Sequence, residues 1–289
     1  MTVVTINYND YKTVIKFIDE IKLYNNIDHI IIVDNCSTDN SYQYLLGFLS
    51  EKVKVIQSER NGGYGYGNNF GIKYAKDKFN EKYVLICNPD VKFSEETLQS
   101  LINVLLNDDG QTGIVAPVMK NRYGNIEKST AWEVPGGWQY VLSSVRILKR
   151  LVTDGLYNLE PGFDNDIIEV GCVAGSMLLV NVDIFFKCGG YDEEIFLYCE
   201  ETVLGIKMNN IGKKTKLLLS QYFLHFHSVS ISKSIASKHK QEKMIWKSRK
   251  YVLKTYYRFN VLEIALVSLL EKFTYIINFI QNKLSRQER

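Results

Sequence analysis

Two carboxylates in this sequence come directly after short apolar runs, a position from which a side chain can reach a ligand. Asp34 closes the run HIIIVD, and Asp90 follows the run YVLIC in the tripeptide Asn88-Pro89-Asp90. Carboxylate oxygens suit hard cations such as Mg2+ and Mn2+, which bridge phosphates. A metal–diphosphate site is expected to show two carboxylates, whereas residues 88–90 contain one. Residues 88–90 therefore have two interpretations, a variant metal site and a plain Asn-Pro-Asp turn.

The polar run that follows Asp34 also has two interpretations. A carboxylate at a strand tip can accept a hydrogen bond from the N3–H of a uracil or thymine ring. Ser37 and Asp39 are typical of turns and helix caps, so they need no ligand to explain them. Asp34 is the residue of this run that turn chemistry explains least well.

An acidic pair and two histidines are further candidates for chemistry. Glu200 and Glu201 open a helix-like stretch, where a carboxylate could deprotonate a hydroxyl group as general base. Acidic residues are also favoured in the first turn of any helix, and an exposed charged face is the other alternative. His225 and His227 alternate with apolar residues in FLHFHSVS, so they share one face of a strand. Imidazole suits Mn2+ and similar ions, and a purely structural histidine is the alternative.

A glycine-rich loop, RNGGYGYGNNFG, covers residues 60–71. A dinucleotide fingerprint would need glycine at position 70, where Phe70 stands, and would follow the first strand rather than the third. One interpretation is a loop whose backbone approaches a nucleotide-sugar closely, with Arg60 or Asn61 supplying polar contacts. The other is a flexible turn before a helix.

The elements that must position these residues alternate regularly along the first hundred residues. Short apolar runs at 2–7, 29–34, 53–57 and 83–87 are separated by helix-like stretches at 11–24, 37–49 and 68–79. This order predicts an α/β fold with a mainly parallel sheet and helices on both faces. Ligands bind beyond the carboxyl ends of such strands, and the residues just past those ends are 7–8, 34–39, 60–67 and 88–90.

Further strands are expected at 113–119, 170–180 and 214–220, with loop and helix at 181–212. We interpret this part as a continuation of the same sheet. The sequence thus predicts three parts: a nucleotide-sugar-binding half at 1–112, an acceptor-binding and catalytic half at 113–230, and a helical tail at 231–289.

Composition sets broad limits on the class of protein. The chain has 289 residues, 46% of them hydrophobic, and a net charge of +3. The five cysteines form no CxxC pair, which argues against a zinc site and a disulfide framework and favours a reducing compartment. We read no signal peptide and no apolar run of membrane-spanning length, and expect a cytoplasmic protein.

The tail has a different character from the rest of the chain. Residues 233–258 include nine Lys or Arg and one acid, Glu242, with interleaved aromatic residues, and an amphipathic helix is expected over the last forty residues. The tail could lie on an anionic inner membrane leaflet, pack against a second subunit in a homodimer, or form a solvated face. No nucleic-acid recognition motif accompanies the charge, so we expect no nucleic-acid partner.

Taken in order, these segments resemble the family 2 glycosyltransferases of bacterial polysaccharide synthesis, which have the GT-A fold. The segments that carry the resemblance cover residues 1 to about 230 and are VTINYN, IIIVDNCSTDNS, RNGGYGYGNNFG, YVLICNPDV, VAGSMLLV, GGYDEEIFLYCEETVLGIKM and HFHSVS. The rhamnosyltransferase-like branch, which commonly has Asn-Pro-Asp where other GT-A enzymes have Asp-x-Asp, looks most similar.

The resemblance implies a role for each matching residue. The base and ribose would be held by Thr5, Asn7 and Asp34, and the nucleotide-sugar would be bordered by Arg60, Asn61 and Gly62. Asn88 would lie near the ribose or diphosphate, while Asp90 would contact the nucleotide-sugar and bind the metal together with His227, with His225 as the second choice. Glu201 occupies the position of the catalytic base, where the family has aspartate, and Val203 replaces the last acid of that motif.

The resemblance also implies a reaction. An inverting glycosyltransferase would use Mn2+ or Mg2+ and move a sugar, with L-rhamnose from dTDP-rhamnose as the best guess, onto a saccharide or lipid-linked acceptor. The alternatives are a UDP-sugar transferase acting on galactose, galactofuranose, glucose or GlcNAc, and an inactive nucleotide-sugar-binding scaffold. The residues that depart from the family pattern are Asn88, Glu201 and Val203, and these departures are the reason for retaining the scaffold hypothesis.

Overall fold

The computed structural model describes residues 1–145, 147–159, 166–226 and 237–287. Its first half alternates strands and helices: β1 (Thr2–Asn7), α1 (Tyr11–Ile21), β2 (His29–Asp34), α2 (Ser41–Leu46), β3 (Val53–Gln57), α3 (Tyr64–Phe79) and β4 (Tyr83–Cys87). The four strands pair in parallel in the order β3-β2-β1-β4. The expected α/β class with a mainly parallel sheet is therefore confirmed, and the strand boundaries agree with the apolar runs.

The second half adds to the same sheet. Its elements are β5 (Val91–Lys92), α4 (Glu95–Leu106), β6 (Thr112–Asn121), β8 (Ile167–Val170), β10 (Met177–Asn181), α6 (Val182–Lys187), α7 (Glu200–Asn210) and β11 (Lys214–His225). Strand β10 runs antiparallel between β4 and β6, and β11 pairs in parallel with β6. The sheet is thus continuous across residue 112, and the division of the chain at residues 112 and 230 stays a prediction.

One expected strand is interrupted. Residues 170–180 were predicted to form a single strand, but the chain forms β9 (Cys172–Val173), a break at 174–176, and then β10. Strand β9 leaves the main sheet and pairs with β7 (Ala131–Trp132) in a separate two-stranded sheet. The single-strand prediction is wrong because a continuous apolar run does not reveal that its two ends pair with different partners.

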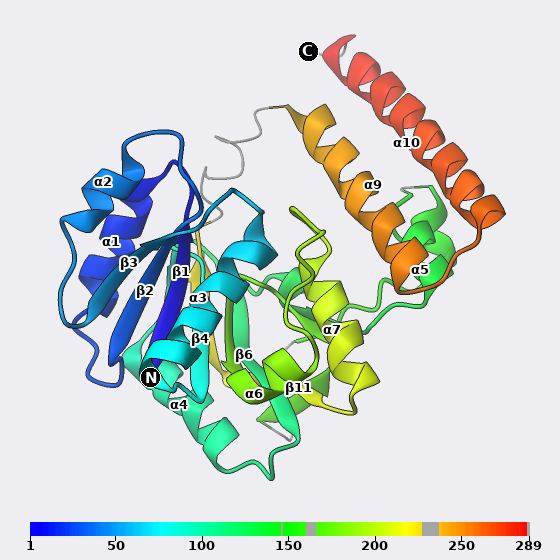
Figure 1. The fold of residues 1–289 in the computed structure, drawn as a ribbon. Coiled ribbons are helices and arrows are strands. Elements are labelled where there is room, and N and C mark those ends of the chain that lie inside the picture. Colours follow the sequence, from blue (N-terminus) through cyan, green and yellow to red (C-terminus); the bar gives the residue numbers. More distant parts are fainter. Residues whose placement is uncertain (146, 160–165, 227–236, 288–289) are drawn as a thin grey trace.

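Helices cover both faces of the sheet (Figure 1). One core contains Val3, Phe17 and Leu98, which join β1 to α1 and α4. The other contains Val4, Ile72 and Phe185, which join β1 to α3 and α6. Adjacent residues of β1 therefore enter opposite cores, which explains why the strands read as unbroken apolar runs.

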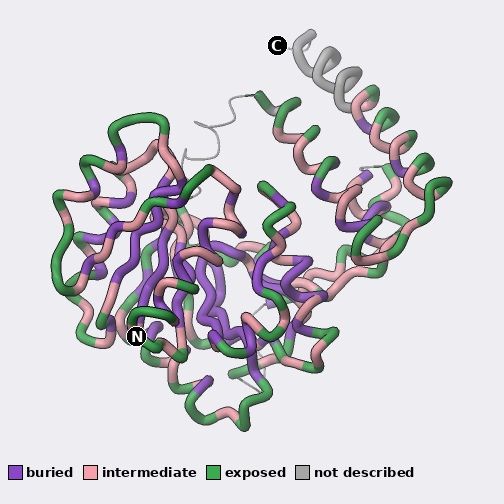
Figure 2. Tube along the Cα trace, in the orientation of Figure 1, coloured by how far each residue is buried: buried purple, intermediate pink, exposed green. Residues whose placement is uncertain are grey.

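A third core lies outside these two layers. It joins α5 (Gly137–Leu142) and α7 to the helices α9 (Lys238–Thr255) and α10 (Val261–Gln287). Buried side chains of this core include Tyr140, Val203, Trp246 and Val267. The expected amphipathic tail is thus a pair of helices, which we call the C-terminal hairpin, and Figure 2 shows their buried residues along α9 and α10. No described helix is long and apolar enough to cross a membrane.

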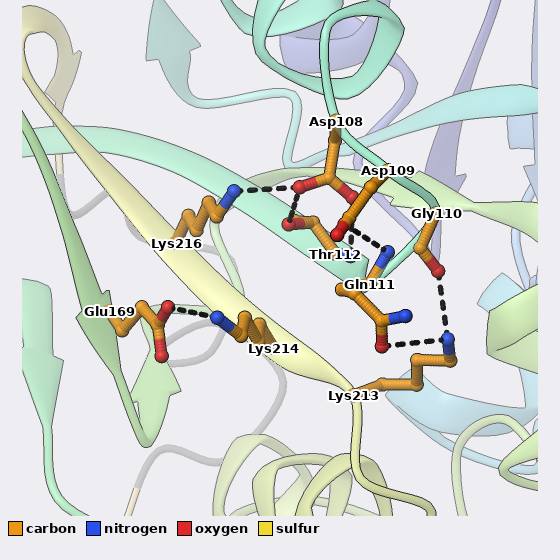
Figure 3. A network of polar contacts seen from close by, with 9 residues as sticks. All are labelled: Asp108, Asp109, Gly110, Gln111, Thr112, Glu169, Lys213, Lys214 and Lys216. Carbon is orange, nitrogen blue, oxygen red and sulfur yellow. Dashed lines mark hydrogen bonds and ion pairs between the residues drawn. The ribbon is translucent and has the colours of Figure 1, made fainter.

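A polar network ties the second half together where β6 and β11 begin (Figure 3). Asp108 accepts hydrogen bonds from Lys216 Nζ at 2.7 Å and from the Thr112 hydroxyl and amide, each at 2.7 Å. Burial opposes ionisation of Asp108, but the hydrogen bonds from Lys216 and Thr112 outweigh it and lower its pKa to about 2. In the same network, Lys213 donates to the Gly110 carbonyl and to Gln111, and Lys214 pairs with Glu169 of β8, so the network has a structural role.

Candidate active site

The carboxyl ends of β1 and β2 meet in a hydrogen-bonded cluster centred on Asp34. Its Oδ1 accepts from Asn7 Nδ2 at 2.7 Å and from the Ser37 hydroxyl at 2.6 Å, while its Oδ2 accepts from the Ser37 amide and from Gln57 Nε2, both at 3.0 Å. Asp34 is fully buried. A carboxylate has about four acceptor positions, and here four donors occupy them. The geometry therefore shows Asp34 holding the strand tips in place, and contact with a base would require one donor to move.

Thr5 differs from Asp34 in having an unused polar atom. The side chain is fully buried in β1, and no described residue hydrogen-bonds its hydroxyl oxygen. A buried hydroxyl without a partner is costly, so such an atom is a candidate contact for a ligand or an ordered water. The nucleotide-binding role of Thr5 stays a prediction, and it requires a neighbouring group to move because the hydroxyl is fully buried.

The glycine loop is hydrogen-bonded both to the strand tips and to the segment before α7. Asn35 Nδ2 donates to Asn61 Oδ1 at 3.1 Å and to the Gly63 carbonyl at 2.9 Å. The Tyr64 amide donates to the Phe196 carbonyl at 3.0 Å, and a Cβ at Gly63 would lie 1.9 Å from that same oxygen. Gly63 also has φ +92°, so both its conformation and its surroundings require glycine. Residues 60–63 are therefore held by hydrogen bonds and by the close approach at Gly63, whereas residues 64–71 of the expected loop form the start of α3.

Arg60, at the start of this loop, is exposed, and its guanidinium lies 5.0 Å from the ring centre of Tyr66. Gly62 lies next to the same ring, since a Cβ there would be 2.4 Å from Tyr66 Cγ. These contacts place the predicted donor-binding residues 60–62 at the surface of the strand-tip edge, with Arg60 oriented by Tyr66.

The stretch Asn88-Pro89-Asp90 links β4 to β5. Strand β5 lies at the edge of the sheet opposite β3, where it pairs with the end of β11. This pairing sets Val91 opposite His225 and brings His225 Nε2 to 3.5 Å from Asp90 Oδ1. The Phe226 amide donates to the Asp90 carbonyl at 3.0 Å. His225, the second choice for the metal ligand, thus lies beside Asp90, whereas His227, the first choice, lies outside the described residues.

The donor set at this point fits a divalent cation in part. A carboxylate and an imidazole are both suitable ligands for Mn2+, and each side chain is about nine-tenths buried. Among the described residues, no group of three or more His, Cys, Asp or Glu is arranged to hold a metal. Of the described residues, Asp90 and His225 would therefore supply two ligands and leave the other positions around a cation to further oxygen atoms such as those of a substrate, as a single acid in this stretch predicts.

The acidic pair begins α7, as expected. Two consecutive residues before it, Tyr198 and Cys199, have left-handed backbone angles with φ +70° and +76°, which is uncommon outside glycine and marks a constrained turn. Burial raises the pKa of Glu200, and the neighbouring charge of Glu201 raises it further. Burial also raises the pKa of Glu201, although backbone amides including that of Gly175 partly offset this effect. The pair is thus poised to exchange protons nearer neutral pH than ordinary glutamates.

The break between β9 and β10 connects all of these groups. A Cβ at Gly175 would lie 3.0 Å from Glu201 Oε1, so glycine allows the carboxylate to approach the backbone. The Tyr64 hydroxyl donates to the Gly175 carbonyl at 2.5 Å. The next residue, Ser176, accepts from the Asn88 amide at 2.9 Å through its carbonyl and lies 3.4 Å from His225 Nδ1 through its hydroxyl. Two adjacent residues therefore contact the acidic pair, the glycine loop and the Asp90–His225 pair.

Sequence reasoning did not assign a role to Asn35, Tyr64, Gly175 or Ser176. Asn35 and Tyr64 belong to segments already considered for binding, and Gly175-Ser176 belongs to the segment VAGSMLLV. The signal that could have found the last two is the Gly-Ser pair inside an apolar run, because glycine weakens a strand and often marks a close backbone approach.

Comparison with known proteins agrees with this geometry. The model of the family described as glycosyl transferase family 2 matches residues 2–177, which is more than half of the chain. The chain belongs to glycosyl transferase family 2. The family resemblance expected from the sequence is therefore confirmed.

Two relatives show how this family 2 chain compares with curated members. It is similar to the low-salt glycan biosynthesis hexosyltransferase Agl10 of Haloferax volcanii, at 25% identity over 70% of this chain and 59% of the relative. It is also similar to the N-acetylglucosaminyl-diphospho-decaprenol L-rhamnosyltransferase of Mycobacterium tuberculosis, at 26% identity over 72% of this chain and 69% of the relative. The family 2 chain thus spans about three fifths to two thirds of these relatives.

A solved structure supports the fold. The mannosyltransferase PcManGT from Pyrobaculum calidifontis, in complex with GDP-Man and Mn2+, superposes with a TM-score of 0.59 at 12% identity, covering 96% of this chain and 70% of the other. This likeness concerns the fold and confirms the GT-A architecture expected from the sequence.

Proposed function

We propose that this family 2 protein is an inverting glycosyltransferase that moves a sugar from a nucleoside-diphosphate donor onto a saccharide or lipid-linked acceptor. The observation that carries the proposal is the contact of Gly175-Ser176 with three groups at once. A candidate base, a candidate donor loop and a candidate phosphate-and-metal pair are fixed relative to one another, as group transfer between two bound substrates requires.

L-Rhamnose from dTDP-rhamnose is the donor that we propose first. Two features support it: the Asn88-Pro89-Asp90 stretch, which resembles the rhamnosyltransferase-like branch, and the activity for which the mycobacterial relative is named. That relative's name also describes an acceptor carried on a lipid diphosphate, which favours a lipid-linked acceptor here. A UDP-linked galactose, galactofuranose, glucose or GlcNAc donor is the alternative.

In the proposed mechanism, Glu201 removes the proton from the acceptor hydroxyl, and the oxygen attacks the anomeric carbon from the face opposite the departing diphosphate. A raised pKa suits this role, because a general base works best when its pKa is near the working pH. Glu200 lies beside Glu201, and burial together with the charge of Glu201 raises the pKa of Glu200, so the two carboxyl groups exchange protons as a pair. Asn61 and Gly62 border the donor, and Thr5 offers its buried hydroxyl to the base or ribose.

Asp90 and His225 would hold a divalent cation together with the donor's diphosphate. When bound, Mn2+ or Mg2+ would supply positive charge to neutralise the diphosphate as it leaves. The solved relative contains Mn2+, which supports the choice of ion.

A donor panel tests the proposal. Purified protein with Mn2+ is incubated with dTDP-rhamnose and with the four UDP-sugars, and release of free nucleoside diphosphate is measured beside calorimetric binding of dTDP and UDP. We expect hydrolysis of one donor and its loss in Glu201→Gln. The inactive scaffold would instead bind a nucleotide tightly, hydrolyse no donor, and behave identically with Glu201→Gln.

A further inference from the structure

The outer side of α10 is apolar and exposed. Its residues follow one another at spacings of four and three, which places them on one face of the helix. They are Leu262, Leu266, Leu269, Phe273 and Ile276, with Leu262 81% and Leu269 61% exposed. We call this set the α10 outer face. Figures 1 and 2 show α10 on the side of α9 that faces away from the sheet.

The side of α10 that faces α9 contains polar as well as apolar residues. Glu271 accepts from Lys250 of α9 at 2.7 Å and from the Tyr275 hydroxyl at 3.1 Å. The hydroxyl groups of Ser268 and Thr274 donate to backbone carbonyls of their own helix at 2.9 and 2.8 Å. The helix is thus apolar on two sides: Val267, Ile264 and Leu270 pack into the third core, and the α10 outer face is exposed, whereas a surface helix of a soluble protein ordinarily has a polar outer side. A continuous exposed apolar face of this kind marks an interaction surface.

The charge of the hairpin indicates what the surface contacts. Residues 237–287 contain eleven Lys or Arg and three Glu, whereas the rest of the chain contains 24 Lys or Arg and 29 Asp or Glu. Lys240, Lys243, Lys247 and Lys254 are exposed and share one side of α9. An apolar helix face accompanied by a basic surface matches an anionic bilayer, which offers acyl chains and negative phosphate groups together.

A second copy of the chain fits less well. Pairing two α10 outer faces would bury the apolar residues, but it would also bring two strongly basic hairpins together, and like charges oppose such contact. That arrangement would leave the exposed lysines of α9 without a role. Charge complementarity therefore favours a lipid surface over a homodimer.

The hairpin also contacts the segment that leads into the acidic pair. The Ser248 hydroxyl of α9 donates to the Leu197 carbonyl at 2.8 Å, and the hydroxyl groups of Tyr251 and Tyr256 donate to Asp192 Oδ2 at 3.0 and 2.6 Å. A surface bound to the hairpin would thus lie near the side of the site where Glu201 meets an acceptor.

We propose that the C-terminal hairpin is the membrane-docking surface of this protein. The α10 outer face enters the interface of an anionic phospholipid bilayer, with α10 parallel to the membrane plane, and the lysines of α9 contact the phosphate headgroups. The inference extends the proposed function, because a lipid-linked acceptor lies in a bilayer. Vesicle binding is measured without donor or acceptor, so failure of this inference and failure of the proposed activity give different results.

The test is co-sedimentation of the full chain with vesicles of phosphatidylglycerol and phosphatidylethanolamine, compared with vesicles of phosphatidylcholine. We expect binding to the anionic vesicles that weakens as salt rises. Leu269→Glu/Phe273→Glu should reduce the partition coefficient about tenfold or more, and Lys240→Gln/Lys243→Gln/Lys247→Gln should do the same. Donor hydrolysis should stay unchanged in both variants, which also shows that they fold.

Matched changes elsewhere on the surface serve as controls. Leu23→Glu alters a leucine that is 73% exposed outside the hairpin, and Lys16→Gln/Lys78→Gln/Lys82→Gln removes three exposed lysines outside the hairpin. Both should bind as the unmodified chain does. Absence of vesicle binding, or equal loss in hairpin and control variants, would overturn the proposal. So would a dimer that binds no vesicles and that Leu269→Glu/Phe273→Glu converts to a monomer.

Discussion

Two adjacent carboxylates at the start of α7 are kept where burial makes their charges costly. Glu200 is 4% exposed, and no described residue hydrogen-bonds its Oε1. Such an arrangement lowers the stability of the folded chain, because the unfolded chain can ionise both groups in water. A stability cost located beside a candidate base is typical of a functional site.

Changing each glutamate separately should distinguish the two roles. Transfer requires Glu201 without its proton, so the rate should rise with pH through a pKa above the ordinary glutamate value. Glu200→Gln removes the neighbouring negative charge, so the acidic limb of the rate profile should move to lower pH. Glu201→Gln should lower the rate by roughly a hundredfold or more at every pH. Steady-state rates measured between pH 5 and pH 9, roughly the range in which raised carboxyl pKa values fall, check both effects.

Equilibrium unfolding provides an independent check on Glu200. Both buried carboxylates have raised folded pKa values, so they destabilise the protein once pH exceeds the unfolded glutamate value. Glu200→Gln should therefore raise the free energy of unfolding by about 1 kcal/mol at pH 8 and by less at pH 4. An equal gain at both pH values would show that the charge of Glu200 is not the cause.

A second prediction at this scale concerns the single acid of residues 88–90. With Asp90 and His225 as the described protein ligands, Mn2+ should bind weakly to the free chain and much more tightly when dTDP or UDP is present. Asp90→Ala should remove both the metal binding and the metal-dependent activity. Asn88→Asp should be tolerated or should strengthen metal binding, because it restores a second carboxylate. Calorimetry with Mn2+, with and without nucleotide, measures each case.

The two histidines of this segment can be compared in the same titration. The position of His225 beside Asp90 predicts that His225→Ala weakens Mn2+ binding in the presence of nucleotide. His227→Ala is the matched change two residues away. If only His227→Ala weakened binding, the assignment of His225 from the geometry would be wrong.

Among the elements, the glycine loop and the segment before α7 are joined where Gly63 meets Phe196. Gly63→Ala would add a Cβ 1.9 Å from the Phe196 carbonyl oxygen and would also strain a residue with φ +92°. Gly124→Ala is a suitable control, since Gly124 has φ +82° but no heavy atom lies within 4 Å of its added Cβ. In both variants, backbone strain should lower the free energy of unfolding by about 1 kcal/mol.

Only Gly63→Ala should lower the free energy of unfolding further, by on the order of 1–3 kcal/mol, because the loop must move away from the Phe196 carbonyl. The same movement should also reduce donor hydrolysis in Gly63→Ala. Urea denaturation and the donor assay measure the two losses. Similar behaviour of the two variants would indicate that the contact at Gly63 does not matter.

Across the whole molecule, the C-terminal hairpin and the catalytic half are joined through Asp192. Tyr251→Phe/Tyr256→Phe removes the two hydroxyl groups that donate to its Oδ2. Each hydrogen bond contributes about 1 kcal/mol, so the variant should lower the unfolding free energy and loosen residues 191–199. Hydrogen exchange of that segment should become faster, while Tyr123→Phe, at a tyrosine that is 82% exposed, should change nothing. Unaltered hydrogen exchange in the double variant would show that the hydroxyl groups of the hairpin do not stabilise residues 191–199.

Much of this arrangement follows from sequence. Apolar runs at regular spacing predict the parallel strands, because a strand buried on both faces must be apolar at each position. Asp34 and Asp90 follow such runs, so their place at the carboxyl edge of the sheet is predictable too. The acidic pair at the start of α7 and the amphipathic helical character of the tail were likewise expected from local residue patterns, whereas the division of the tail into α9 and α10 was not.

Other features depend on contacts between distant segments, which local patterns do not contain. His225 lies beside Asp90 only because β5 crosses the sheet to pair with β11. Gly175 contacts Glu201 only because the predicted strand at 170–180 breaks and α7 packs against that break. The apolar residues of α10 are visible in the sequence, but which of them face outward is set by α9, against which Val267 and Glu271 of the helix pack. The sequence by itself therefore determined which residues stand at the site, and the tertiary structure decided which of them meet, because strand pairing and helix packing join residues that are far apart along the chain.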